Sequence, residues 1–209
     1  DLQGIDQRRN FYSGSLAMRK NSLMLRRFLS IFARYLSVAL CLTIMTGEAM
    51  AGDPENTLYL DLEHGRVVIE LRPDLAPNHV ARIKELTREG FYDGIVFHRV
   101  IEGFMAQSGD PTGTGTGGSG QNLKAEFSNE PHVRGSASMA RAGHPDSADS
   151  QFFIVFDRAP HLDGQYTVWG KVVEGMDNVD LIKKGAPGSG MVDGPDKIVK
   201  MQVAADVKE

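Results

Sequence analysis

The chain has 209 residues, with 23 Lys and Arg against 27 Asp and Glu, which gives a formal net charge of −4. Its apolar fraction of 41% and charged fraction of 24% are those of an ordinary globular protein and exclude a collagen-like, disulfide-rich or largely disordered chain. The length is sufficient for one medium-sized domain or two small ones. The single cysteine, Cys41, excludes an intramolecular disulfide and a metal site built from cysteines.

Charge divides the chain into two parts. Residues 1–51 carry 7 basic and 3 acidic residues, a balance of +4, whereas residues 52–209 carry 16 basic and 24 acidic residues, a balance of −8. The basic part contains an uncharged run, Tyr35–Thr46, and ends in the small-x-small triplet Ala49-Met50-Ala51. This combination is typical of a secretory signal peptide, and the run is shorter than the ~20 apolar residues of a membrane span.

We therefore predict an N-terminal extension with a signal peptide over residues 1–51, cleaved after Ala51, and one domain over residues 52–209. Cleavage removes Cys41, which suits an exported, periplasmic protein in an oxidising compartment. The alternatives are an N-terminal amphipathic helix, an uncleaved leader that tethers the protein to a membrane, and a lipoprotein modified at Cys41. Leu40 is a poor residue to precede such a modification.

The domain opens with a predicted β-hairpin followed by a helix. Apolar and polar residues alternate in Thr57–Glu63 and again in Arg66–Leu71, which predicts two strands joined by a turn at His64-Gly65. Pro77 suits the first position of a helix, because its missing N–H would have no partner there. The helix is expected to end at Gly90, which provides a C-terminal cap.

Short apolar runs separated by turn-rich segments follow the helix. We predict them to be strands: Ile95–Ile101, Phe104–Gln107, Ser136–Ala140, Gln151–Phe156 and Thr167–Val173. A second short helix is predicted at Gly175–Lys184, and a last strand at Lys197–Ala205. Many strands with only two helices favour a closed barrel or a sandwich, because closure removes exposed strand edges.

Several kinds of chemistry have little support in the sequence. Gly113–Gly120 contains G-x-G-x-x-G twice, but no amphipathic helix follows, as dinucleotide binding requires, so we predict a flexible surface loop that lines a groove. The six histidines lack metal-ligand spacing, so we expect no metal ion or other cofactor, and we interpret His98 as a core histidine. No G-x-S-x-G elbow is present, and Ser138 and Ser150 have no evident His–Asp partners.

One arginine stands in unusual surroundings. Arg99 lies in an otherwise apolar segment, close to Phe104, Met105 and Gln107. Met105 and Gln107 have the same parity in a strand and share a face, and Gly103 is expected to interrupt the register between them and Arg99. A guanidinium beside aromatic and thioether groups, with an amide nearby, suits an apolar ring next to a polar amide. The alternative is a core strand whose arginine reaches solvent.

Four segments together resemble the cyclophilin family of peptidyl-prolyl cis–trans isomerases, and in particular its exported bacterial members. They are Phe97–Asp110, Ser138–Gly143, Ser150–Ile154 and Leu162–Val172, and the resemblance runs from about Thr57 to about Ala205. It implies an eight-stranded antiparallel β-barrel closed by two α-helices. It also implies a monomeric enzyme without a cofactor that rotates X–Pro peptide bonds in unfolded or folding exported proteins.

The resemblance also implies the roles of individual residues. Arg99 would be the catalytic arginine, and Gln107 would anchor the substrate carbonyl. The proline pocket would be formed by Phe104, Met105, Phe153 and Leu162, and covered by Tyr166. The peptide groove would be lined by Ala140 and Arg141 through their backbones, by Gly115 in the glycine-rich rim and by Gln151 in a neighbouring pocket.

The sequence departs from the family pattern at three positions. His161 replaces the usual tryptophan, which hydrogen-bonds cyclosporin, so weak cyclosporin binding is expected. Tyr166 stands where many eukaryotic members have histidine, and Arg141 replaces a frequent asparagine, which favours acidic substrate side chains. A proline-peptide binding module or holdase chaperone with incidental turnover is the alternative function. Nucleic-acid binding conflicts with the balance of −8.

Overall fold

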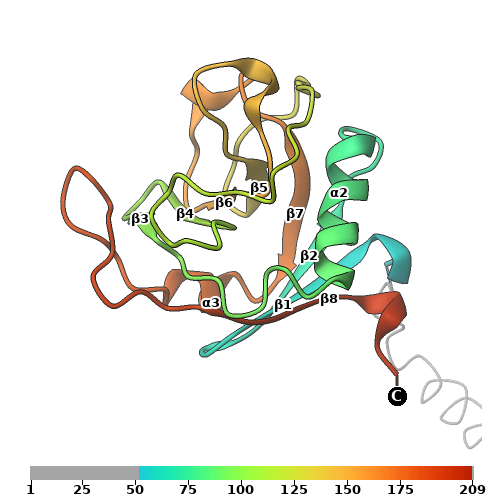
Figure 1. Cartoon of the computed structure of the whole chain (residues 1–209), viewed down its shortest axis with the longest axis horizontal. Coiled ribbons are helices and arrows are strands. Elements are labelled where there is room, and N and C mark those ends of the chain that lie inside the picture. The colour runs from blue at the N-terminus through green and yellow to red at the C-terminus, as the bar shows by residue number, and fades with distance from the viewer. Residues whose placement is uncertain (1–51, 209) are drawn as a thin grey trace, which may run out of the picture. The chain divides into compact units, whose positions relative to one another are not determined.

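The computed structural model describes residues 52–208, and the predicted leader, Cys41 and the cleavage site after Ala51 lie outside them. Eight antiparallel strands form one curled sheet around the core (Figure 1). The strands are β1 (Thr57–Leu62), β2 (Gly65–Leu71), β3 (Arg99–Ile101), β4 (Met105–Ser108), β5 (Ser136–Met139), β6 (Phe152–Val155), β7 (Val168–Glu174) and β8 (Ile198–Val203). Their order in the sheet is β3-β4-β6-β5-β7-β2-β1-β8. The helices are α2 (Pro77–Arg88) and α3 (Met176–Asp180), with short 3-10 turns at Pro54–Asn56, Pro145–Ser147, Pro160–Leu162 and Ala204–Asp206.

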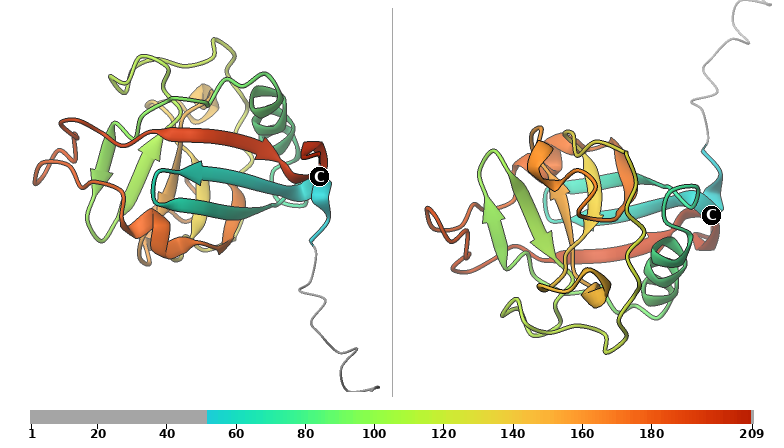
Figure 2. Two further views of the ribbon diagram at one scale, coloured as in Figure 1. Left: turned by 90° about the horizontal axis from the view of Figure 1, so that it is seen from below. Right: turned by 90° about the horizontal axis from the view of Figure 1, so that it is seen from above.

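The first two strands form the predicted hairpin. Leu58 pairs with Ile69, and Leu60 pairs with Val67, so the buried members of both alternating patterns meet on the same face. Figure 2 shows β1 and β2 lying beside β8, which forms the outer strand on this side of the sheet.

Helix α2 begins and ends where the sequence predicts, but its start is capped from elsewhere in the chain. Ala76, the residue before the helix, provides no side-chain cap. Instead, the Glu126 carboxylate accepts hydrogen bonds from the backbone N–H groups of Asn78 and His79, at 3.1 and 3.0 Å. At the other end, Gly90 has a φ of 71°, and the Phe91 N–H donates to the Leu86 carbonyl, so the C-terminal cap is confirmed.

Two separate apolar clusters are buried in the domain. The larger one fills the curled sheet and contains the fully buried rings of Tyr92, Phe97, Phe152 and Trp169. The smaller one consists of Met105, Phe153, Val155, Ala159 and Leu162, and we call it the pocket cluster. Because the two clusters are distinct, the residues that shape the functional site are not those that hold the main core.

The sheet does not close by a continuous ladder. Among residues 52–208, no ladder joins β3 to β8, and isolated bridges such as Val96–Lys197 link the two sides instead. The closed barrel expected from the sequence is therefore not confirmed, and the sheet is a curled half-barrel with eight antiparallel strands and two helices. The predicted strand Ile95–Ile101 is regular only from Arg99 onward, which leaves too few residues on this side for a ladder.

Helix α3 is also shorter than predicted. It spans Met176–Asp180, whereas the sequence pattern extends over Gly175–Lys184. The helix stops because the chain turns after Leu181, and the Lys183 N–H donates to the Asp196 carboxylate at 2.7 Å. No helix within residues 52–208 has the length and apolar character needed to cross a membrane.

Candidate active site

The hairpin of β3 and β4 places Arg99 directly opposite Gln107. Gly103 lies in the turn between the two strands, where the Phe104 N–H donates to the Ile101 carbonyl at 3.0 Å. The expected break in register at Gly103 is therefore absent, because the turn reverses the chain and aligns the two polar residues. Arg99 Nη1 donates to Gln107 Oε1 at 3.3 Å, and both side chains share a face of the sheet.

Arg99 belongs to a chain of hydrogen bonds in which every other member is uncharged. Gln107 Nε2 donates to Gln151 Oε1 at 2.9 Å, and Gln151 Nε2 donates to the Gly117 carbonyl at 2.8 Å. On the other side, Arg99 Nε donates to the Ser189 carbonyl at 3.2 Å. Arg99 Nη2 makes no hydrogen bond to any group of residues 52–208, so it remains free for a ligand.

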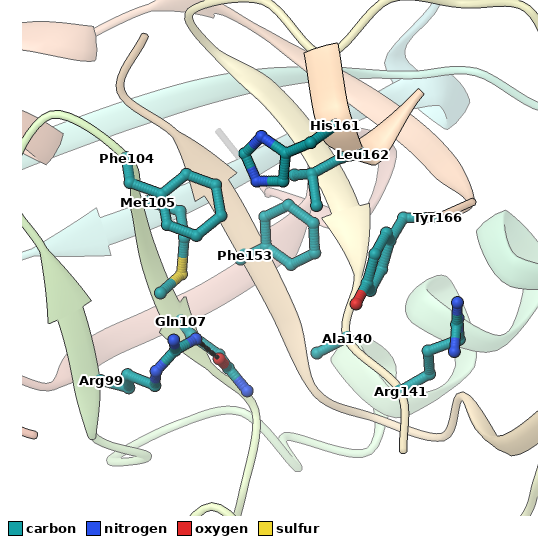
Figure 3. A pocket seen from close by; sticks show the side chains of 10 residues that line it. All are labelled: Arg99, Phe104, Met105, Gln107, Ala140, Arg141, Phe153, His161, Leu162 and Tyr166. Carbon is teal, nitrogen blue, oxygen red and sulfur yellow. Dashed lines mark hydrogen bonds between the residues drawn. The ribbon is translucent and has the colours of Figure 1, made fainter. Parts of the chain in front are cut away.

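A pocket of about 270 Å³ opens here, with Arg99 and Gln107 at its rim and an apolar recess at its base (Figure 3). The buried side chains of Met105, Phe153 and Leu162, all from the pocket cluster, form its base. Phe104 and His161 stand at one side with their ring centroids 5.2 Å apart, and Tyr166 packs edge-on against Phe153. An apolar recess with a guanidinium and an amide at its rim suits a small aliphatic ring attached to a peptide group.

A buried polar group supports the base of the pocket. The His132 ring stacks on Phe153, and the Asp163 carboxylate accepts the His132 backbone N–H at 2.8 Å. Burial lowers the pKa of His132 and so favours the neutral imidazole. Arg158 donates to Asp163 and holds the pKa of that carboxyl well below its usual range. Burial of His132 therefore opposes a charge beneath the pocket, and Arg158 forms an ion pair with its carboxylate partner Asp163.

A second pocket of about 420 Å³ adjoins the first. The two pockets share Gln107, Ala140 and Arg141 in their linings, and the second one is also lined by Gly115 and Gln151. The shared residues mark the junction of a groove that runs from the apolar recess to the glycine-rich segment.

The glycine-rich segment is a loop, as predicted, and it is tied down by two carboxylates. Asp110 is 1% exposed and accepts hydrogen bonds from the backbone N–H groups of Thr112, Gly115 and Gly117. Asp149 accepts from the N–H groups of Ser119 and Gly120. Burial alone would raise the pKa of Asp110, but the hydrogen bonds from Thr112 and the two glycines outweigh it and lower the pKa to about 2. The expected flexibility has no support in these contacts.

Arg99 and Arg141 share an electrostatic feature. Within residues 52–208, these are the two arginines that have no carboxylate oxygen within 4.0 Å. Each of the other arginines forms an ion pair: Arg66, Arg72, Arg82, Arg88, Arg134 and Arg158. Arg141 instead stacks over the Tyr166 ring at 4.7 Å and donates to the Ala142 carbonyl. Two unneutralised cations therefore lie on the groove, one on each side of the apolar recess (Figure 3).

The structure brings together the residues that the resemblance singles out. All of them except Gly115 and Gln151 line the first pocket, and those two line the second. The sequence reasoning missed Ser189, which contacts Arg99 from 90 positions away, and the anchoring roles of Asp110 and Asp149. No local sequence pattern could reveal the contact of Ser189, because it is made by a backbone carbonyl, which every residue type has.

No metal site is apparent in the part of the chain that the structure describes. Residues 52–208 contain no group of three or more His, Cys, Asp or Glu side chains arranged to hold an ion. The absence of a metal or cofactor in the reaction stays a prediction from the sequence.

Comparison with known proteins identifies relatives over the whole domain. A sequence model described as "Cyclophilin type peptidyl-prolyl cis-trans isomerase/CLD" matches residues 57–203. A protein of Brucella suis named "Probable peptidyl-prolyl cis-trans isomerase" is 58% identical over 173 residues, which cover 77% of this chain and 88% of the relative. The "Peptidyl-prolyl cis-trans isomerase B" of Bacillus subtilis is 49% identical over 137 residues, which cover 61% of this chain and 95% of the relative.

Solved structures share the fold. Cyclophilin AquaCyp293 from Hirschia baltica superimposes with a TM-score of 0.68 at 30% identity and covers 75% of this chain and 76% of its own. A Cryptosporidium parvum cyclophilin-type peptidyl-prolyl cis-trans isomerase, crystallised in the presence of the dipeptide Ala-Pro, superimposes with a TM-score of 0.66 at 29% identity. That match covers 70% of this chain and 98% of the other.

Proposed function

The chain belongs to the cyclophilin-type peptidyl-prolyl cis–trans isomerase family, and from this premise we propose that Arg99 stabilises the twisted X–Pro amide during catalysis. The protein is a peptidyl-prolyl isomerase, as its relatives are named. The reaction has a barrier of roughly 20 kcal/mol, because the C–N bond of the planar amide has partial double-bond character. The enzyme must therefore bind the twisted amide more tightly than the planar one.

The observation that supports the proposal is a guanidinium at the rim of an apolar recess whose Nη2 makes no hydrogen bond to residues 52–208. When the amide twists, resonance is lost, and the prolyl nitrogen gains a lone pair that can accept a hydrogen bond. Arg99 Nη2 is free to donate this bond, and the guanidinium stays protonated at every physiological pH. The planar amide offers no such acceptor at nitrogen, so the interaction acts on the transition state alone.

The remaining groups hold the substrate in place. Gln107 has two Nε2 protons, of which one reaches Gln151, so the other is available to the substrate carbonyl. The proline ring is proposed to fill the recess formed by Phe104, Met105, Phe153 and Leu162, with Tyr166 over it. No acid–base pair, nucleophile or cofactor is required, because no covalent bond is made or broken.

The peptide is proposed to continue along the groove past Ala140 and Arg141. The Ala140 N–H already donates to the Gln151 carbonyl at 2.9 Å, so the backbone contacts fall to the Ala140 carbonyl and the Arg141 N–H. Beyond them, the second pocket with Gly115 and Gln151 would take a neighbouring substrate residue. Arg141 lacks a carboxylate partner among residues 52–208, which supports a preference for acidic substrate side chains.

The substrates are proposed to be proline-containing segments of exported proteins during folding. The basic leader, its apolar run and the triplet before Gly52 support export to the periplasm, where the enzyme would act as a monomer. X–Pro bonds isomerise in tens of seconds without a catalyst, which is slow enough to limit folding.

The test compares the chain with its Arg99→Ala variant in an NMR exchange assay on a short Ala-Pro peptide. We expect the wild-type protein to accelerate the cis–trans exchange, and the variant to lose this acceleration by about 100-fold, the usual cost of removing one transition-state donor. Equal rates for the two proteins would refute the role of Arg99.

A further inference from the structure

The loop that precedes β8 covers the free edge of β3. We call residues 185–191 the edge loop; in Figure 2 it runs out beside β3 on the side away from β4. The Gly185 N–H donates to the Val100 carbonyl at 2.9 Å, and the Val100 N–H donates to the Gly190 carbonyl at 2.7 Å. Since β3 is the outermost strand, these bonds supply the partners that a further strand would otherwise provide.

The same loop grips the side chain of Arg99. Arg99 Nε donates to the Ser189 carbonyl at 3.2 Å, and the Arg99 backbone forms an isolated bridge with Met191. Gln107 holds Nη1 of the same group. A guanidinium is planar, so fixing Nε and Nη1 fixes the plane and leaves Nη2 as the nitrogen without a partner among residues 52–208.

The close packing of the edge loop against β3 depends on Gly190. This residue has a φ of 74°, and a Cβ added to it would overlap Ile101 Cγ1 and lie 3.3 Å from Arg99 Cγ. A side chain at position 190 therefore displaces the Ile101 side chain and crowds the neighbouring Arg99 side chain at Cγ. Gly188 offers a matched comparison, since its φ is 85° but a Cβ there would have no atom within 4 Å.

We propose that the edge loop is a positioning element for Arg99, in which the Ser189 carbonyl aims the guanidinium and Gly190 permits the close approach. The inference rests on the proposed role of Arg99 in the reaction. The loop contacts Arg99 directly, and none of residues 185–191 lines the apolar recess. Displacing the loop therefore lowers kcat while the affinity for the proline ring is retained.

The experiment compares Gly190→Ala with Gly188→Ala. Both substitutions place an alanine in a left-handed conformation, but only the first creates an overlap with β3. We expect Gly190→Ala to lower kcat about tenfold or more with KM nearly unchanged, because small displacements of a catalytic group are costly. Gly188→Ala should stay within about twofold of the wild type, as expected for an exposed position without contacts. An unchanged kcat in Gly190→Ala overturns the proposal.

A double-mutant cycle separates positioning of Arg99 from a general effect on the fold. In the Arg99→Ala background, Gly190→Ala should cause no further loss of kcat/KM, because the group that it displaces is gone. A further loss by the same factor as in the wild type would show that the loop acts independently of Arg99 and would overturn the inference. If Arg99→Ala alone leaves the rate unchanged, the proposed function fails instead.

The wild-type protein supplies a test that does not depend on the folding of any variant. Arg99 Nε–H should exchange with solvent at least about tenfold more slowly than the Nε–H of a free arginine, because it is bonded to the Ser189 carbonyl. NMR of the 15N-labelled protein measures this rate. Exchange as fast as in free arginine would show that the grip on Arg99 does not exist in solution.

Discussion

Arg99 is surrounded by uncharged hydrogen-bond partners. The Gln107 amide and the Ser189 carbonyl orient it, and no carboxylate oxygen of residues 52–208 lies within 4.0 Å to neutralise it. A carboxylate partner would neutralise the guanidinium in both the ground state and the transition state. Without one, the positive charge of Arg99 can act on the substrate. The segment Phe97–Asp110 identifies Arg99 in the sequence, but only the structure shows that Gln107 and Ser189 orient it.

The other unpaired arginine of the groove should affect substrate choice. Replacing Arg141 by Gln removes the positive charge but keeps a polar side chain that can reach the same backbone carbonyls. We expect the ratio of kcat/KM for peptides with Glu and with Lys beside the X–Pro bond to fall about two- to fivefold, the range of a partly exposed charge pair. The preference should also weaken in high salt. An unchanged ratio would contradict the assigned preference.

His161 should determine the response to cyclosporin. Its ring stands against Phe104 at the wall of the recess, where the family usually carries an indole. His161→Trp adds apolar surface and an N–H donor, so we expect the inhibition constant to fall by roughly tenfold or more from a weak wild-type value. Titration of the isomerase rate with cyclosporin gives both constants. Tight inhibition of the wild type would refute the expectation.

At the scale of elements, strands and helices with long sequence patterns are predicted better than those with short ones. The alternation in residues 57–71 and the periodicity of α2 span many residues, and the structure reproduces their bounds closely. The β3–β4 hairpin is missed because three- and four-residue strands leave little periodicity, and Gly103 can mark either a break or a turn. The cap of α2 by Glu126, 48 residues from Asn78, has no local signal at all.

The glycine-rich loop should make stability depend on acid pH through Asp110. Its pKa is about 2 in the folded protein against 3.8 ordinarily, so the contribution is complete above pH 4 and is lost as the pH falls toward 2. The shift corresponds to roughly 2 kcal/mol of unfolding free energy. Asp110→Asn should therefore be destabilised near neutral pH and should lack this part of the acid-induced decline. Urea unfolding at pH 6 and pH 2.5 measures both effects.

A matched variant isolates the contribution of Asp110 from that of other carboxylates. Asp193 is exposed, and its carboxylate makes no hydrogen bond to residues 52–208, so Asp193→Asn should retain the wild-type decline between the two pH values. If Asp110→Asn and Asp193→Asn lose stability equally on acidification, the loop is not tied down by Asp110 in the way the hydrogen bonds indicate.

At the scale of the whole molecule, the chain combines a basic N-terminal segment with an acidic remainder. The balance changes from +4 in residues 1–51 to −8 in residues 52–209. If the leader directs export and is removed, N-terminal sequencing of the exported protein should begin at Gly52. Recovery of residues 1–51 on the exported protein would favour an uncleaved, membrane-tethering leader instead.

The separation of the two apolar clusters divides the work of the domain. The main core holds the curled sheet together, while the pocket cluster shapes the recess. No residue of the β1–β2 hairpin belongs to the pocket cluster. Alternation in the sequence predicts the part of the first cluster that lies in β1 and β2, and the family resemblance predicts most of the second. The edge loop belongs to neither cluster and is held by tertiary contacts, so no sequence pattern predicts its position.

The most direct test of the central claim separates rate from affinity in Arg99→Ala. Phe104→Ala, which alters the wall of the recess without removing the charge, is the matched control. Line-shape analysis of an X–Pro peptide gives the rate of exchange on the enzyme and the Kd for each protein. We predict that Arg99→Ala loses about 100-fold in the rate with Kd within about threefold, whereas Phe104→Ala chiefly weakens Kd. An unchanged rate in Arg99→Ala, or a loss of affinity as large as the loss of rate, would contradict transition-state stabilisation by Arg99.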